Sequence, residues 1–154
     1  GVITIPLLPF LVILLLLTPV HEGLHVLFHP GWGASANSVI GLWLSRGLLY
    51  AHYEGQMSRN RFLLVGAAPY LILSWLPIGI IALLRTIPWV PAATPAMTVL
   101  SILAILGGLT ASGDLLGFGL LAFQVPRTAV VRNKGWRTYW RKPDRCASRS
   151  IGPL

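Results

Sequence analysis

The sequence predicts an α-helical membrane protein, a bundle of about three transmembrane helices with a short β-hairpin between the first and the second. Hydrophobic residues make up 55% of the 154 residues and charged residues only 10%, whereas soluble domains average about 25% charged. Three apolar stretches are each long enough to cross a hydrocarbon core of about 30 Å, which takes roughly 20 helical residues. Short apolar runs separated by turn residues lie between the first two stretches.

The predicted spans cover approximately residues 3–28, 62–84 and 95–123. Prolines interrupt the first two, which membrane helices tolerate when neighbouring groups satisfy the freed carbonyls. Residues 2–17 resemble the apolar part of a signal peptide. However, no basic stretch precedes them and no small-residue cleavage site follows, so we expect a retained span. Together the spans form a predicted membrane-embedded domain over residues 1–125.

The segment between the first two spans predicts a β-hairpin over about residues 39–54. Residues 39–44 and 48–54 are short runs rich in β-branched, aromatic and aliphatic side chains, and Ser45-Arg46-Gly47 separates them. The alternative is a re-entrant or interfacial loop without a sheet.

The distribution of Lys and Arg predicts the orientation. Eight of the twelve basic residues follow Pro126, and three more (Arg46, Arg59, Arg61) lie between the first two spans. We therefore expect a multi-pass protein of the cell membrane with residues 126–154 as a basic cytoplasmic tail that contacts membrane lipids. The alternative is a disordered tail whose charge only sets the orientation. The net charge of +8 does not predict a nucleic-acid partner, because the basic residues do not lie on a polar domain. A single cysteine, Cys146, excludes a zinc site built from cysteines.

His21-Glu22-Gly23-Leu24-His25 is an H-E-x-x-H run near the end of the first apolar stretch. On a helix, histidines four residues apart lie on one face, so both imidazoles can bind the same Zn²⁺. Glu22 is not needed as a ligand and is free to act as general base for a zinc-bound water. Ionisable residues within a membrane span are costly and usually functional, which favours this interpretation over a chance motif.

A third ligand should lie at a similar depth on another helix, and Asp114 meets this condition. Asp114 is about 18 Å before the cytoplasmic end of the third span, and His25 is about 8 Å before the end of the first. Tilt and kinks make these depths compatible. Asp114 is the only acid in its apolar stretch. Alternatively, it is a buried acid paired with another helix, or part of a proton relay.

The surroundings of Asp114 predict close helix packing and a supporting hydrogen bond. Gly113 and Gly117 form a small-xxx-small pair that lets helices approach. Thr110, one turn earlier, could donate to the Asp114 carboxylate.

Three further residues are weaker candidates for the third ligand. His29 lies at i+8 from His21, about 12 Å along the helix axis, which is too far for a shared metal unless the helix breaks. His52 and Glu54 belong to the predicted hairpin, and we expect them on the surface or on the substrate side.

Several stretches of the chain resemble the putative zincin peptidase family of integral membrane proteins, which is similar to the site-2 proteases, the intramembrane zinc metalloproteases. The resemblance rests on H-E-G-L-H in the first span, the short β-like insertion, and S-G-D in a later span. It also rests on Tyr50-Ala51-His52-Tyr53-Glu54-Gly55 and Ala68-Pro69-Tyr70, and covers roughly residues 15–120. It implies His21, His25 and Asp114 as zinc ligands and Glu22 as the catalytic acid and base. Site-2 proteases carry their aspartate in L-D-G, whereas here the order is Gly113-Asp114-Leu115.

The expected function is zinc-dependent hydrolysis of a membrane-protein or peptide substrate at the cytoplasmic side of the membrane. The hairpin could bind the substrate as an added strand, which requires a hairpin edge near His21. A second hypothesis is a non-catalytic membrane protein with a structural or regulatory zinc site closed by four ligands. A third is a small transporter or ion-pathway subunit with a proton relay of His and Asp.

Overall fold

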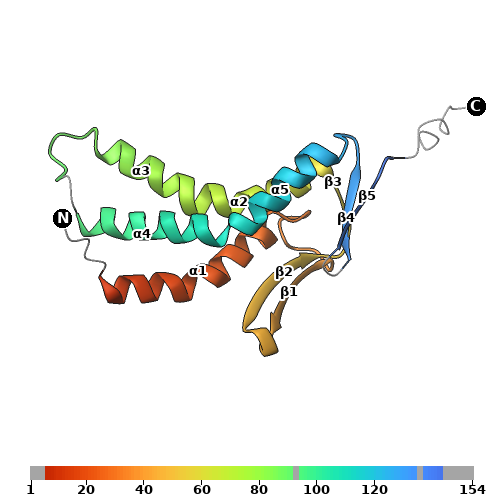
Figure 1. Ribbon diagram of the computed structural model, residues 1–154, viewed down its shortest axis with the longest axis horizontal. Coiled ribbons are helices and arrows are strands. Elements are labelled where there is room, and N and C mark those ends of the chain that lie inside the picture. The colour runs from red at the N-terminus through yellow and green to blue at the C-terminus, as the bar shows by residue number, and fades with distance from the viewer. Residues whose placement is uncertain (1–5, 92–93, 135–136, 144–154) are drawn as a thin grey trace, which may run out of the picture.

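A computed structural model describes residues 6–91, 94–134 and 137–143 (Figure 1). Its helices are α1 (Leu7–Phe28), α2 (Arg59–Tyr70), α3 (Leu76–Leu84), α4 (Pro95–Thr110) and α5 (Ser112–Gln124). Its strands are β1 (Ser38–Trp43), β2 (Leu48–Tyr53), β3 (Gln56–Ser58), β4 (Val130–Lys134) and β5 (Arg137–Arg141). A π-helical turn, η2 (Leu71–Trp75), joins α2 to α3, and a 3-10 turn, η1 (Leu44–Arg46), joins β1 to β2.

Two of the helices are long and apolar enough to cross a membrane. These are α1 and the continuous run α2–η2–α3 from Arg59 to Leu84, and the bent pair α4–α5 counts as a third if it is one span. Only 11% of the most apolar window of α1 is buried, so most of its apolar side chains face outward. The second helix begins at Arg59, three residues before the predicted start, because the Ser58 hydroxyl caps it by accepting from the Arg61 N–H.

The third predicted span is not one straight helix. It bends by 50° at Ala111, the residue between α4 and α5. The bend lies directly before Ser112 and Gly113, and Gly/Ser pairs are a common cause of sharp helix kinks. Asp114 consequently lies in the first turn of α5 rather than midway along a single span.

The predicted hairpin is confirmed, and the alternative of a loop without a sheet is wrong. β1 and β2 pair antiparallel from Ser38 opposite Tyr53 to Trp43 opposite Leu48. Gly47 makes the reversal possible, because its φ of 61° lies in the left-handed region that favours glycine. In Figure 1 this hairpin projects beside the end of α1.

A second sheet was not predicted from the sequence. β4 pairs with both β3 and β5 in antiparallel fashion, so part of the expected tail joins the segment before α2. A small apolar core holds this sheet against α5 and α2; it consists of Leu121, Val125, Ala129 and Val131, with Phe62 and Leu63 packed on it. The basic residues after position 143 lie outside the described residues, as do residues 3–5 of the first predicted span.

Close helix packing occurs at Gly107 rather than at the predicted pair Gly113 and Gly117. A Cβ added at Gly107 would lie 2.5 Å from the carbonyl oxygen of Leu73 in η2. Added at Gly113 or Gly117, it would meet nothing within 4 Å. The backbone of α4 therefore rests on the π-helical turn, and the two later glycines leave open space beside Asp114.

Candidate metal centre

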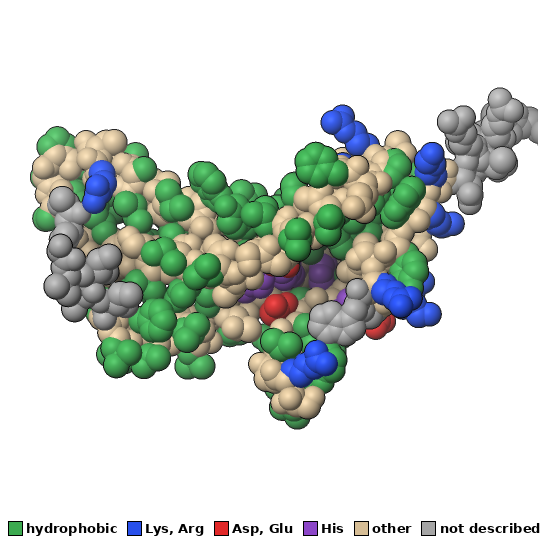
Figure 2. Space-filling view, viewed as in Figure 1, with side chains coloured by type: hydrophobic (Ala, Val, Ile, Leu, Met, Phe, Trp, Pro, Cys, Tyr) green, Lys and Arg blue, Asp and Glu red, His purple; other side chains and the backbone are tan. Residues whose placement is uncertain are grey.

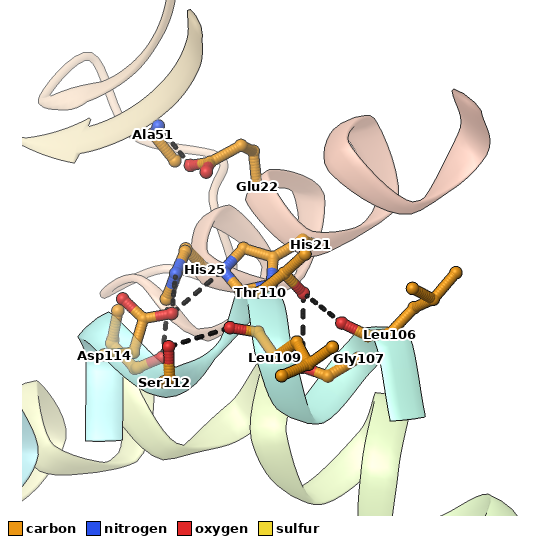
Figure 3. Close-up of polar contacts among 11 residues, drawn as sticks. His21, Glu22, His25, Ala51, Leu106, Gly107, Leu109, Thr110, Ser112 and Asp114 are labelled. Atoms are coloured by element: carbon orange, nitrogen blue, oxygen red, sulfur yellow. Dashed lines mark hydrogen bonds and ion pairs between the residues drawn. The ribbon is translucent and has the colours of Figure 1, made fainter. Parts of the chain in front are cut away.

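The structure brings His21, His25 and Asp114 together at the junction of α1 and α5 (Figure 3). One nitrogen or oxygen from each lies within 4.8 Å of the other two. His21 Nε2 is 2.9 Å and His25 Nε2 3.4 Å from the same oxygen, Asp114 Oδ2. Because His21 and His25 are four residues apart, α1 presents both imidazoles on one face. The bend at Ala111 turns Asp114 toward them.

The chain orients the two histidines unequally. His25 Nδ1 lies 2.9 Å from the carbonyl oxygen of Val65 in α2, which can only accept, so Nδ1 carries the proton and donates it. That tautomer leaves a lone pair on Nε2, directed at the cluster. His21 is buried, and its Nδ1 has no hydrogen-bond partner among the described residues. Its Nε2 faces Asp114, so both rings direct Nε2 inward.

The donor set fits zinc. Two imidazoles and a carboxylate are typical protein ligands of a catalytic zinc site, with a fourth position left for water or substrate. With bonds near 2.0–2.2 Å, tetrahedral donors lie about 3.3 Å apart. The distances from Asp114 Oδ2 to Nε2 of His21 and of His25, 2.9 and 3.4 Å, lie close to that value. A hydrogen bond from a ring N–H to a backbone carbonyl, as at His25, is a common support for a metal-binding histidine.

Glu22 reaches in a different direction from the three clustered residues. Its Oε2 accepts a hydrogen bond of 2.6 Å from the backbone N–H of Ala51 in β2. Figure 3 shows the side chain extended toward β2, while His21 and His25 extend toward Asp114. The hairpin therefore holds the carboxylate that lies next to the cluster in sequence, a contact that the H-E-x-x-H pattern does not reveal.

The other predicted candidates lie outside the cluster. Among the described residues, His29, His52 and Glu54 are not part of the group that could hold a metal ion. His29 Nδ1 pairs with the Ser38 hydroxyl at 3.2 Å. Burial lowers the pKa of His29 to about 4, and the nearby Arg61 acts in the same direction. The imidazole is therefore neutral at pH 7.

The predicted support of Asp114 by Thr110 is wrong. Thr110 Oγ1 donates within its own helix, to the carbonyl oxygens of Leu106 at 3.0 Å and Gly107 at 3.2 Å. A threonine near a helix end commonly satisfies a carbonyl one turn back. The bend at Ala111 follows immediately, so Thr110 and Asp114 no longer follow one helical repeat.

Sequence reasoning missed a role for Arg61. Its Nε donates to the carbonyl of Phe28 at 2.7 Å, and one terminal nitrogen donates to the carbonyl of His29 at 2.8 Å. Both carbonyls lie at the end of α1, where no later helical turn supplies a donor, and the His29 carbonyl also accepts from the Trp32 N–H at 3.0 Å. Arg61 thus fixes the end of the ligand-bearing helix to α2, which supplies the Val65 carbonyl. The available signal was the pair Arg59 and Arg61 just before an apolar span, which by itself indicates only the orientation.

A cleft with a volume of about 470 Å³ opens onto the cluster. It is bounded by α1, β2, α2 and α5 and by the β3–β4–β5 sheet, and His25 and Asp114 lie on its wall. Figure 2 shows histidine and acidic side chains at the bottom of a hollow in the middle of the molecule. The candidate metal centre is therefore accessible from outside while its ligands stay partly buried.

The fold and the site define a class: helical proteins with two long apolar helices that carry a candidate zinc site on an H-E-x-x-H helix. Residues 14–130 match the profile of a family described as "Putative zincin peptidase". The chain belongs to this family, which supports zinc as the metal and peptide hydrolysis as the activity. No curated protein and no solved structure matches the chain.

Proposed function

We propose that the protein is a membrane-embedded zinc metalloprotease that hydrolyses peptide bonds in or near the membrane, at its cytoplasmic side. The observation that carries the proposal is the meeting of His21 and His25 with Asp114, ninety residues away, beside an open cleft. Structural zinc sites are closed by four protein ligands, whereas catalytic sites keep one position open. Among the described residues the group has three members, which favours the catalytic alternative.

Each residue of the site has a specific task in this proposal. Nε2 of His21, Nε2 of His25 and the Asp114 carboxylate would hold Zn²⁺. When bound, zinc supplies a Lewis acid that polarises the scissile carbonyl and lowers the pKa of water to about 7. Glu22 takes the proton from the attacking water and then delivers it to the leaving amine. The partial burial of the ligands strengthens these interactions, because fewer water dipoles screen them.

The placement in the membrane rests on the apolar surfaces and on the charges. Apolar side chains cover the outside of α1, an arrangement suited to lipid and unfavourable in water. Arg132, Lys134, Arg137 and Arg141 lie in β4 and β5, whereas Arg46 lies between α1 and α2, and Arg59 and Arg61 lie in the first turn of α2. The rule that cytoplasmic loops are rich in these residues therefore puts the sheets on the cytoplasmic side.

Removing zinc should abolish cleavage reversibly. We expect purified protein in lipid vesicles to contain one zinc ion per chain and to cleave a labelled transmembrane peptide. A chelator should remove both the metal and the activity. Zinc should restore the rate, whereas Mg²⁺ should not, because Mg²⁺ prefers oxygen ligands to imidazole. Mass spectrometry measures the bound zinc, and a gel assay measures cleavage of the peptide. Full activity in zinc-free protein would contradict the proposal.

We further propose that the substrate binds as a strand added to β2. Ala51 lies opposite Ile40 of β1, but its N–H donates to Glu22 and not to β1. Ala51 and Ile40 are therefore a non-hydrogen-bonded pair of the antiparallel ladder. By alternation, Leu49, Ala51 and Tyr53 direct their N–H and C=O groups to the outer edge of β2. This edge lies at Glu22 and borders the cleft, as the strand-addition hypothesis requires. An added strand would compete for the Ala51 N–H and so release the Glu22 carboxylate for proton transfer.

Leu49→Pro tests the added strand, because proline removes one outward N–H without removing a bond to β1. We expect kcat/KM to fall about two- to tenfold, the effect of one lost hydrogen bond. Leu42→Pro is the matched control, since Leu42 is the partner of Leu49 and its N–H faces the opposite edge of the hairpin. Equal losses in the two variants would exclude pairing at the β2 edge.

A further inference from the structure

The cleft extends beyond the candidate metal ligands to the β3–β4–β5 sheet. Asn133, Thr138 and Trp140 line it together with Met57, and Gln124 of α5 lies on the same wall. Asn133 is paired with Thr138, and Trp140 with Val131, which is also the partner of Met57. Directly opposed residues of antiparallel strands point to the same side, so these side chains form one inner face of the sheet.

This inner face combines an aromatic ring with one side-chain amide and one hydroxyl group. Trp140 is 46% exposed although it lies on a cleft wall, so its ring is accessible to a ligand. Asn133 Oδ1 accepts a hydrogen bond of 2.9 Å from Thr138 Oγ1, which orients its amide and leaves the NH₂ group as a donor. Peptide carbonyls accept from such donors, and apolar side chains pack against indole rings. The face therefore suits an extended peptide that carries a large apolar side chain.

The outer face of the same strands has a different character. This outer face carries four exposed basic residues that do not line the cleft: Arg132, Lys134, Arg137 and Arg141. Tyr139 lies on the same face, between Arg137 and Arg141. Figure 2 shows basic side chains gathered at the end of the molecule where β4 and β5 lie. Anionic lipid headgroups suit that outer face. The inner face, by contrast, is continuous with the cavity that contains His25 and Asp114.

The family profile ends at residue 130, the first residue of β4. The matched region contains His21, His25 and Asp114, whereas Asn133, Thr138 and Trp140 lie beyond it. The metal-binding end of the cleft and Met57 of β3 thus lie within the region that matches the family, whereas the inner-face residues of β4 and β5 lie beyond it.

We propose that the inner face of the β3–β4–β5 sheet is a substrate-selecting subsite. It binds a large apolar or aromatic side chain of the polypeptide next to the bond being cleaved, with Trp140 against that side chain and Asn133 bonded to an adjacent peptide carbonyl. The proposal rests on the proposed protease function, because it takes the occupant of the cleft to be the chain that is cleaved.

Photo-crosslinking at neighbouring positions of β5 tests the subsite. The full chain with Glu22→Gln is reconstituted in phosphatidylcholine vesicles, with benzoylphenylalanine at position 138 on the inner face or at 139 on the outer face. The probes are two fluorescein-labelled unstructured peptides that differ only in a central Phe or Asp. We expect the Phe peptide to crosslink about tenfold more from 138 than from 139, and about tenfold more than the Asp peptide. Trp140→Ala should weaken binding of the Phe peptide about tenfold, and Trp140→Phe should largely preserve it.

Crosslinking does not require turnover, so its outcome is separable from that of the protease proposal. If the wild type cleaves the Phe peptide but position 138 gives no more product than position 139, the subsite is wrong and the protease remains. If crosslinking from 138 is selective and no peptide is cleaved, the protease proposal fails instead. Crosslinking that appears only when phosphatidylglycerol is added would identify the sheet as a lipid-binding surface and overturn the subsite.

Discussion

Replacing Glu22 by Gln should reduce peptide cleavage by a factor of about 10² to 10⁴, the usual contribution of a general acid or base, while bound zinc stays unchanged. Gln has the same shape and its carbonyl can still accept from the Ala51 N–H, so the contact to β2 survives. An amide, however, cannot take up the proton of water. Initial cleavage rates and zinc content, measured on the same reconstituted preparation, give both readouts.

Glu54→Gln is the matched control for this loss. Glu54 follows β2 directly and lies outside the metal-binding group, so the same change of charge should leave cleavage near the wild-type rate. Undiminished cleavage by the Glu22 variant would remove Glu22 from the mechanism. Loss of zinc together with activity would instead give Glu22 a role in metal binding.

Asp114→Asn should weaken zinc binding by more than about a hundredfold, beyond the 10- to 100-fold cost of losing a residue that only supports a ligand. The amide keeps the shape and one oxygen of the side chain but lacks the negative charge that attracts the cation. Competition with a fluorescent zinc chelator in detergent measures the dissociation constant. Cleavage should fall in parallel, because the proposed chemistry depends on the bound metal.

Ser112→Ala serves as the control for local disturbance of the bend. Ser112 lies in the same first turn of α5, and its hydroxyl donates only to the carbonyl of Leu109, at 2.8 Å. We expect its zinc affinity to match the wild type. Unchanged affinity in the Asp114 variant would favour the other interpretation of this residue, a buried acid that pairs with His21 and His25 without a metal.

The elements governed by local rules were predictable. A long apolar stretch that crosses a membrane favours a helix, since a helix satisfies its own backbone hydrogen bonds. The hairpin followed from two short runs around a glycine, and its bounds, Ser38 to Tyr53, differ from the predicted 39–54 by a single residue at each end. The common face of His21 and His25 follows from helical periodicity alone.

Features that depend on distant contacts were not predictable from the same patterns. Long apolar runs flank Ala111 on both sides, so the hydropathy of this stretch does not distinguish one long helix from two joined by a bend. The strands β4 and β5 carry Arg and Lys on one face. This charge made the segment resemble a basic tail, so the alternation of its side chains did not indicate strands. Only pairing with β3, more than seventy residues earlier, makes them part of a sheet. The hydrogen bond from Ala51 to Glu22 likewise joins segments that no local pattern links.

By itself, the sequence determined that this protein has long apolar helices, an H-E-x-x-H face on the first of them and a hairpin after it. Those features arise from interactions within a few residues of the chain. The tertiary structure alone decided that α4 and α5 bend at Ala111, that Asp114 thereby meets the two histidines, and that β2 holds Glu22 at the edge of a cleft. The physical reason is that a metal site needs donors about 3 Å apart, and packing between separate elements sets such distances.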